Sequence, residues 1–176
     1  MGAAGPGFDV MQYARANRFQ RMMRGTAATR PGSWLFIRVL DHVDRPIFRW
    51  TRGRHTLTSI VTGLPVGVLT TTGARSGQPR RSPLLVFPTS EGLVVVASNY
   101  GQARHPSWYH NLRAHPEAEM TIRGRRHRIR ARQVEGEQRE RIWREGLEIY
   151  PGWTTYERWT GGRRIPILLL EPVEPV

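Results

Sequence analysis

The chain has 176 residues and a formal net charge of +13, and its length is enough for one domain with a sizeable core. It contains no cysteine, which excludes disulfides, thiolate nucleophiles and cysteine metal sites. All 27 basic residues other than histidine are arginine, so the absence of lysine also excludes Schiff-base chemistry and a Walker-type phosphate loop. The basic excess favours an anionic partner, which can be a phosphorylated cofactor, an anionic lipid surface or nucleic acid.

Residues 1–30 are rich in glycine, alanine and arginine and show little periodicity, so we expect a flexible N-terminal segment there. Residues 31–176 are expected to form a single domain. From Ser33 to Arg54, apolar residues recur at helical spacing among arginines, which predicts a basic amphipathic helix. Such a helix usually packs on a core, and binding to a membrane surface is the alternative.

No apolar run approaches the roughly 20 residues that a membrane span needs. The N-terminus also lacks the charged and apolar regions of a secretion signal. We therefore expect a cytoplasmic protein, with peripheral membrane association through the basic helix as an open alternative.

From about residue 65 the chain consists of short β runs separated by turn residues. The alternation predicts a hairpin of residues 65–72 and 81–87, a strand at 93–98 that is buried on both faces, and a second hairpin of 118–122 and 125–134. Helices are predicted at 106–112 and 135–149, and a last buried strand at 165–170. Because βαβ alternation is missing, we expect an α+β, mainly β protein: a split β-barrel of about six mostly antiparallel strands, with helices inserted between strands.

Four arginines alternate with other residues along the 125–134 strand and therefore share one face: Arg126, Arg128, Arg130 and Arg132. A nucleic acid could use such a stripe. We favour the solvated face of an edge strand, because charged edges prevent sheets from pairing with one another. No nucleic-acid partner is therefore expected.

The turn between the first two strands carries a concentration of positive charge. Arg75 lies inside the turn and Arg80 opens the outgoing strand, beside glycines whose amides can approach a ligand closely. Two guanidiniums in this arrangement can hold a phosphate or a carboxylate bidentately. The sequence predicts an anion site here, and a solvated basic hairpin tip is the alternative.

The familiar catalytic motifs are missing: there is no Gly-x-Ser-x-Gly elbow, no paired-histidine zinc helix and no Gly-x-Gly-x-x-Gly turn. The spacing of His105, His110 and His115 spreads them around a helix, so no metal site is expected. What remains is the anion site, a polar strand end at residues 98–101, and a group of aromatic residues at 108–109 and 150–159. A flat, phosphorylated ring system would satisfy all three, which points to a flavin-like cofactor.

Four motifs in order make the sequence resemble the deazaflavin-dependent nitroreductase family, over about residues 65–172. They are Leu69-Thr70-Thr71-Thr72-Gly73-Ala74-Arg75-Ser76-Gly77-Gln78-Pro79-Arg80, Ala97-Ser98-Asn99-Tyr100-Gly101, His105-Pro106-Ser107-Trp108-Tyr109-His110-Asn111-Leu112-Arg113-Ala114-His115-Pro116, and Tyr150-Pro151-Gly152-Trp153-Thr154-Thr155-Tyr156 through Arg164-Ile165-Pro166. The resemblance implies a split β-barrel that uses reduced coenzyme F420.

The resemblance also implies roles for individual residues. Arg75 and Arg80 would hold the phosphate and acidic tail of the cofactor, while amides near Ser82 and Ser98 would line the deazaflavin and Trp108 would wall it. The full cofactor-binding set implied is Arg75, Arg80, Ser82, Pro83, Leu84, Ala97, Ser98, Asn99, Ser107 and Trp108. The catalytic residues implied are Tyr150, Trp153 and Tyr156, which would shape the acceptor pocket, with Tyr156 as the hydrogen-bond or proton donor.

Three positions depart from the family pattern. Asn99 and Ala74 stand where basic residues are frequent, and Trp153 stands where a tyrosine is common. The departure at Asn99 implies that one contact to the cofactor tail is lost. The departure at Trp153 means that the resemblance does not imply nitroimidazole substrates.

The implied reaction is hydride transfer from reduced F420 to an electron-poor acceptor such as a quinone, an unsaturated carbonyl or a nitro compound. Two alternatives stay open: an FMN oxidoreductase on the same barrel, and a lipid-binding or membrane-surface protein without turnover. Monomer and homodimer are both compatible with the sequence.

Overall fold

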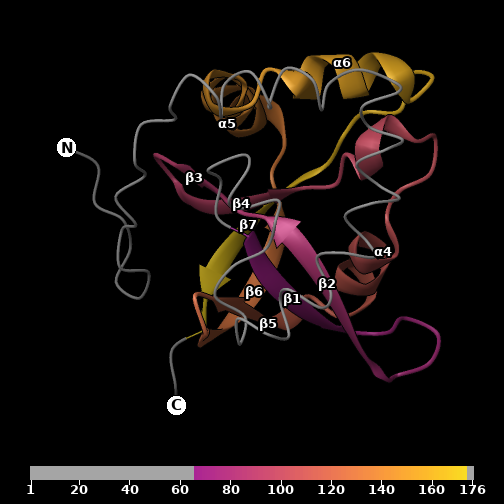
Figure 1. The fold of residues 1–176 in the computed structure, drawn as a ribbon, viewed down its shortest axis with the longest axis vertical. Coiled ribbons are helices and arrows are strands. Elements are labelled where there is room, and N and C mark those ends of the chain that lie inside the picture. Colours follow the sequence, from indigo (N-terminus) through magenta and orange to yellow (C-terminus); the bar gives the residue numbers. More distant parts are fainter. Residues whose placement is uncertain (1–65, 174–176) are drawn as a thin grey trace.

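A computed structural model describes residues 66–173 of the chain (Figure 1). The strands are β1 (Val66–Thr72), β2 (Pro79–Leu85), β3 (Phe87–Thr89), β4 (Gly92–Val96), β5 (Glu117–Ile122), β6 (Arg125–Gln133) and β7 (Ile167–Pro172). The helices are the 3₁₀ turn η1 (Asn99–Gly101), α4 (Ser107–Ala114), α5 (Gly136–Ile149) and α6 (Gly152–Trp159). The expected flexible segment 1–30 and the expected helix between Ser33 and Arg54 lie outside the described residues.

The seven described strands form one antiparallel sheet in the order β2-β1-β5-β6-β7-β4-β3. Strands β2 and β3 lie at opposite edges of this order, yet only Val86 separates them in the chain. The sheet must therefore curl until its two edges meet at Val86, whose side chain is fully buried. This curled sheet confirms the predicted mainly β split barrel, with one strand more than the sequence indicated.

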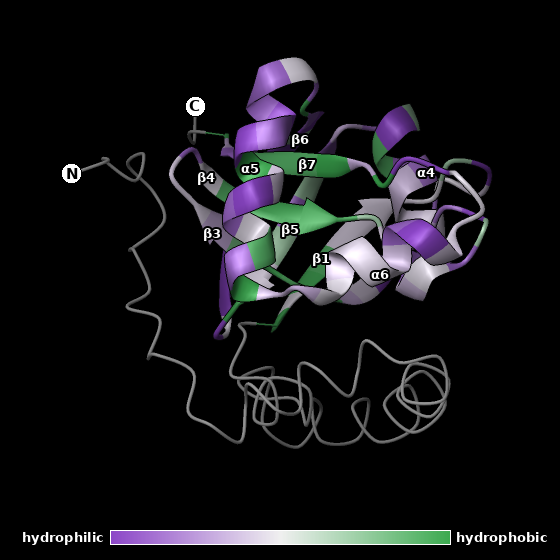
Figure 2. Cartoon of the chain, turned by 90° about the horizontal axis from the view of Figure 1, so that it is seen from above, coloured by the Kyte–Doolittle hydropathy of each residue, from purple (hydrophilic) through white to green (hydrophobic). Residues whose placement is uncertain are grey.

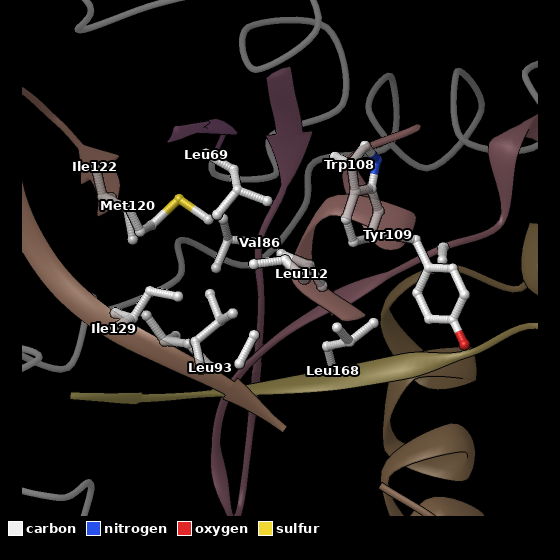
Figure 3. Close-up of a cluster of buried hydrophobic side chains, with 14 residues drawn as sticks. Leu69, Val86, Leu93, Trp108, Tyr109, Leu112, Met120, Ile122, Ile129 and Leu168 are labelled. Atoms are coloured by element: carbon white, nitrogen blue, oxygen red, sulfur yellow. The ribbon is translucent and has the colours of Figure 1, made fainter. Parts of the chain in front are cut away.

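Side chains are buried on both sides of the curled sheet. The cluster inside the barrel includes Leu69, Met120 and Ile129, and helix α4 adds Trp108 and Leu112 to it (Figure 3). A second cluster lies beneath α5 and α6, which Figure 1 shows together against one side of the sheet. Because both sides are covered, β4 and β7 are apolar along nearly their whole length, as predicted for the strand at 93–98.

Hydropathy follows this layering (Figure 2). Strand β7 is hydrophobic along most of its length, while hydrophilic residues are prominent on α5. Helix α5 buries Ile142, Trp143 and Gly146 and exposes Arg141, Arg144 and Glu148, as helical spacing predicts. Among residues 66–173, no helix is long and apolar enough to cross a membrane.

The prediction that the arginine-rich strand is an edge strand is wrong, because β6 pairs with β5 on one side and with β7 on the other. Its arginine face is nevertheless exposed, as expected. Three of the arginines pair with carboxylates on the neighbouring strands: Arg126 with Glu119 at 3.9 Å, Arg130 with Glu117 at 3.2 Å and Arg132 with Glu171 at 2.9 Å. The stripe is thus largely charge-matched, which supports a solvated face rather than a nucleic-acid site.

Candidate functional site

A pocket of about 1010 Å³ opens where the β1–β2 turn meets the first turn of α4. Its lining is basic: three arginines and a histidine contribute to it, and no carboxylate does among the residues described. The lining residues are Gly73, Ala74, Arg75, Ser76, Pro79, Arg80, Arg81, Ser82, Ser107, His110 and Asn111. With its three serine hydroxyls, this set of donors suits a phosphate or carboxylate group.

Backbone hydrogen bonds shape the turn that carries Arg75. The Gly73 N–H donates to the Gln78 carbonyl at 2.9 Å, and the Gly77 N–H donates to the Gly73 carbonyl at 2.8 Å. Gly77 has φ +63°, a left-handed conformation that glycine adopts without cost. The chain therefore reverses tightly, and Arg75 and Arg80 reach the same pocket.

Asn111 on α4 ties this turn to the helix. Its side chain, which is 7% exposed, accepts a hydrogen bond from the Ala74 N–H at 3.0 Å and donates one to Thr71 Oγ1 at 2.9 Å. Thr71 is itself 2% exposed and donates to the Arg80 carbonyl at 3.4 Å. The buried amide of Asn111 thus connects α4 directly to the incoming side of the turn and, through Thr71, to the Arg80 backbone on the outgoing side.

The start of α4 adds to the positive potential of the pocket. The helix begins at Ser107 after Pro106, with no side-chain cap and no acidic residue in its first turn. The first N–H groups of a helix lack acceptors within the helix, and the helix dipole places partial positive charge there. An anion in the pocket therefore meets backbone donors as well as guanidinium groups.

The structure brings together part of the predicted cofactor-binding set. Arg75, Arg80, Ser82 and Ser107 line the pocket, and six other residues are not among its lining: Pro83, Leu84, Ala97, Ser98, Asn99 and Trp108. Ala97 and Trp108 belong to the cluster inside the barrel, where they are 0% and 6% exposed. Figure 3 shows the Trp108 indole at one side of this cluster, near Leu112 and Tyr109.

Arg163 holds the loop that follows β4, between Ala97 and His105. It donates hydrogen bonds to the carbonyls of Ala97 at 3.2 Å, Ser98 at 2.9 Å and Gln102 at 2.9 Å. Its guanidinium also lies 3.0 Å from His105 Nδ1. Since a guanidinium can only donate, Nδ1 must accept, and His105 is neutral with its proton on Nε2.

The environment of His105 supports this protonation state. Burial, together with the charge of Arg163, lowers the pKa of His105 below its usual range. Asn99 contributes to the same loop, because its Nδ2 donates to the Arg104 carbonyl at 2.9 Å.

The three predicted catalytic residues lie in the second core cluster, beneath α5 and α6. The hydroxyls of Tyr150 and Tyr156 are 2.9 Å apart and share a buried hydrogen bond. Trp153 is 2% exposed and packs against Phe87 and Trp143, with ring centroids 4.7 and 5.3 Å away. None of the three lines the basic pocket.

Three residues important to this architecture were not predicted as site residues: His110 and Asn111, which line the pocket, and Arg163, which holds the loop. Asn111 carried a sequence signal, since a polar residue between Tyr109 and Leu112 on the buried side of a helix needs a partner. For Arg163 the sequence offers no such signal. Helix α6 was also unpredicted, because the 153–159 stretch stood out only as aromatic.

The curled sheet and the basic pocket together define a split-barrel protein with a pocket whose donors suit an anionic group. The sequence model for F420H2-dependent quinone reductases matches residues 44–172, and the chain belongs to this family. The resemblance inferred from the motifs is thereby confirmed, and with it the assignment to F420-dependent oxidoreductases.

Individual relatives agree with this assignment. An F420H2-dependent quinone reductase of Mycobacterium tuberculosis is 34% identical over 128 residues, which cover 70% of this chain and 84% of the relative. A solved F420H2-dependent reductase (FDR-A) is 37% identical, with a TM-score of 0.55 over 61% of this chain and 94% of that one. A second solved structure, a domain-swapped dimer, is 34% identical, with a TM-score of 0.58 over 80% of this chain and 99% of that one.

Proposed function

We propose that the chain is an F420H2-dependent quinone reductase. The observation that carries this proposal is the pocket between the β1–β2 turn and α4, whose described lining holds Arg75, Arg80 and Arg81 and no carboxylate. Family membership supports the same cofactor and favours a quinone over the other acceptors considered, an unsaturated carbonyl or a nitro compound.

The residues present fit the charged part of this cofactor. Arg75 and Arg80 would hold its phosphate and acidic tail through charge-assisted hydrogen bonds, and Ser82 and Ser107 would add neutral donors. Bound in its reduced form, the cofactor supplies a hydride to the acceptor. The protein contributes orientation and charge, and Asn111 supports both because it fixes the turn that bears Arg75.

The remaining predicted residues complete the proposal. Ser98 and Asn99, in the loop held by Arg163, would face the ring side of the cofactor together with Pro83 and Leu84. Ala97 and Trp108 would support this side from the core behind it. Tyr156 would hold a proton for the reduced acceptor, and its shared hydrogen bond with Tyr150 supports this role because a phenol in such a pair has a defined orientation. Trp153 would contribute to the acceptor site only indirectly, by packing in the core beneath Tyr150 and Tyr156.

We also propose a cytoplasmic protein that contacts anionic membranes peripherally, supported by the net charge of +13. A homodimer is the assembly that the domain-swapped relative favours. Flotation with anionic liposomes tests the membrane contact, and sedimentation analysis tests the homodimer.

The function is tested by titrating the purified protein with F420 and following cofactor fluorescence. Arg75→Ala and Arg80→Ala each remove a charge-assisted contact and should weaken F420 binding by about tenfold to a hundredfold. The matched control is Arg130→Ala, because Arg130 lies on the exposed β6 face and pairs only with Glu117 among the described residues.

Two results would count against the proposal. Equal weakening by Arg80→Ala and Arg130→Ala would mean that the charge acts as a diffuse field. Purification with a bound yellow flavin that absorbs near 450 nm, without F420 binding, would favour the FMN alternative.

A further inference from the structure

Tyr100 is the only large hydrophobic side chain that is exposed among residues 66–173, with 41% of its surface accessible. It lies in η1, in the loop that leads from the end of β4 to α4. The same loop contains Ser98 and Asn99, and its far end begins the helix that lines the basic pocket.

The backbone at Tyr100 is strained. Asn99, Tyr100 and Gly101 follow one another with φ values of 48°, 54° and 77°, all in the left-handed region. Asparagine and glycine tolerate this region, whereas a tyrosine rarely adopts it. Strain of this kind persists only where the surroundings impose it, and it concentrates at functional sites.

The surroundings do impose it. Arg163 binds the carbonyls of Ala97 and Ser98 before Tyr100 and that of Gln102 after it. Gly101 packs closely against α6: if residue 101 had a side chain, its Cβ would lie 3.0 Å from the Cβ of Trp159. The loop is therefore held on both sides of Tyr100, and the tyrosine cannot relax without breaking these contacts.

This conformation sets the Tyr100 ring against the aromatic residues of α6. Its centroid lies 6.4 Å from that of Tyr156, at an interplanar angle of 75°. Tyr156 is 5% exposed and shares its hydroxyl hydrogen bond with Tyr150. Tyr100 thus extends a buried aromatic cluster to the surface as one rigid, accessible ring, which is the kind of group on which a planar ligand stacks.

We propose that Tyr100 is a specificity-determining residue that stacks against the ring of the quinone acceptor. This inference rests on the proposed function for the identity of the acceptor. A fused bicyclic quinone covers more of the tyrosine ring than a single ring does, so Tyr100 favours naphthoquinones over benzoquinones.

The test compares steady-state kinetics with menadione and with para-benzoquinone, using F420H2 as the donor. Tyr100→Gly removes the ring and relieves the backbone strain, so the variant is expected to fold, and Tyr100→Asn is a second variant that tolerates φ > 0. Both should raise the KM for menadione about threefold to tenfold, with little change for para-benzoquinone. Tyr100→Phe keeps the aromatic ring and should retain the parental preference for menadione.

Two further measurements separate binding from turnover. The dissociation constant of menadione, obtained without F420 by quenching of tryptophan fluorescence, should rise in Tyr100→Gly and Tyr100→Asn as the KM does. The control Arg104→Ala changes an exposed side chain in the same loop and should leave the selectivity between the two quinones unchanged.

The outcomes are distinguishable. If Tyr100→Gly and Tyr100→Asn bind F420 and keep the parental selectivity and menadione affinity, the role of Tyr100 is refuted and the proposed function stands. If Tyr100→Phe loses the preference as fully as Tyr100→Gly, stacking is refuted as the cause. A parent protein that neither binds F420 nor reduces a quinone would overturn both proposals.

Discussion

Replacing Asn111 tests whether the basic pocket depends on a buried hydrogen-bond network. Asn111→Ala removes the acceptor of the Ala74 N–H and the donor to Thr71 Oγ1. Ala74 is exposed, so its N–H can bond to water instead, whereas Thr71 is 2% exposed and cannot. Thr71 Oγ1 loses its donor, although its hydroxyl still donates to the Arg80 carbonyl. At about 1 kcal/mol for each of the two lost bonds, the free energy of unfolding should fall by about 2 kcal/mol.

The same substitution should weaken F420 binding, because the turn that bears Arg75 loses its anchor on α4. Asn111→Asp sharpens the test. Its carboxylate still accepts from the Ala74 N–H but places a negative charge in the pocket lining, so it should weaken F420 more than Asn111→Ala does. If F420 does not place its anionic tail in this pocket, the two variants should bind F420 equally.

Urea unfolding measures the stability of each variant, and fluorescence titration measures its affinity for F420. The reasoning fails if Asn111→Ala unfolds at the same urea concentration as the parent. It also fails if Asn111→Asp binds F420 as tightly as Asn111→Ala.

Three further predictions concern the core and the loop. Gly146→Ala should lower stability by about 1 to 3 kcal/mol despite the better helix propensity of alanine, because the new Cβ would lie 1.8 Å from the Trp153 ring; a higher thermal midpoint would contradict this. Tyr156→Phe should lower turnover more than F420 affinity, because a proton donor matters most in the transition state, and equal turnover would remove Tyr156 from the mechanism. The lowered pKa of His105 means that the unfolded chain takes up a proton that the folded chain resists, so stability should fall as pH drops below about 6.5. Urea unfolding across pH checks this, and Arg163→Gln should reduce the slope because it removes the charge that opposes protonation.

Much of the fold follows from local patterns. Alternation and turn residues located both hairpins, and the unbroken apolar run at 93–98 indicated a strand covered on both faces. Helical spacing placed Ile142 and Trp143 of α5 inward. Each of these signals depends on neighbours along the chain, so a single sequence is enough to detect it.

The candidate site could be predicted only in part. The charge of the β1–β2 turn predicted an anion site, and Arg75 and Arg80 line the same pocket. The partnership of Asn111 with that turn spans about forty residues of sequence, with bonds at sequence separations of 37 and 40, and no local pattern reveals it.

Other features were decided by tertiary structure alone. The alternation along β6 determined that its arginines share an exposed face, but only the pairing with β5 and β7 made it an interior strand with carboxylates beside the charges. The same holds for Trp153. The sequence indicated only that it belongs to an aromatic group expected to shape the acceptor pocket, whereas the tertiary structure buries it in the core against Gly146. The physical reason is the same in both cases: periodicity specifies which way a side chain points relative to its own strand or helix, whereas the neighbours that it meets there are set by how distant segments pack.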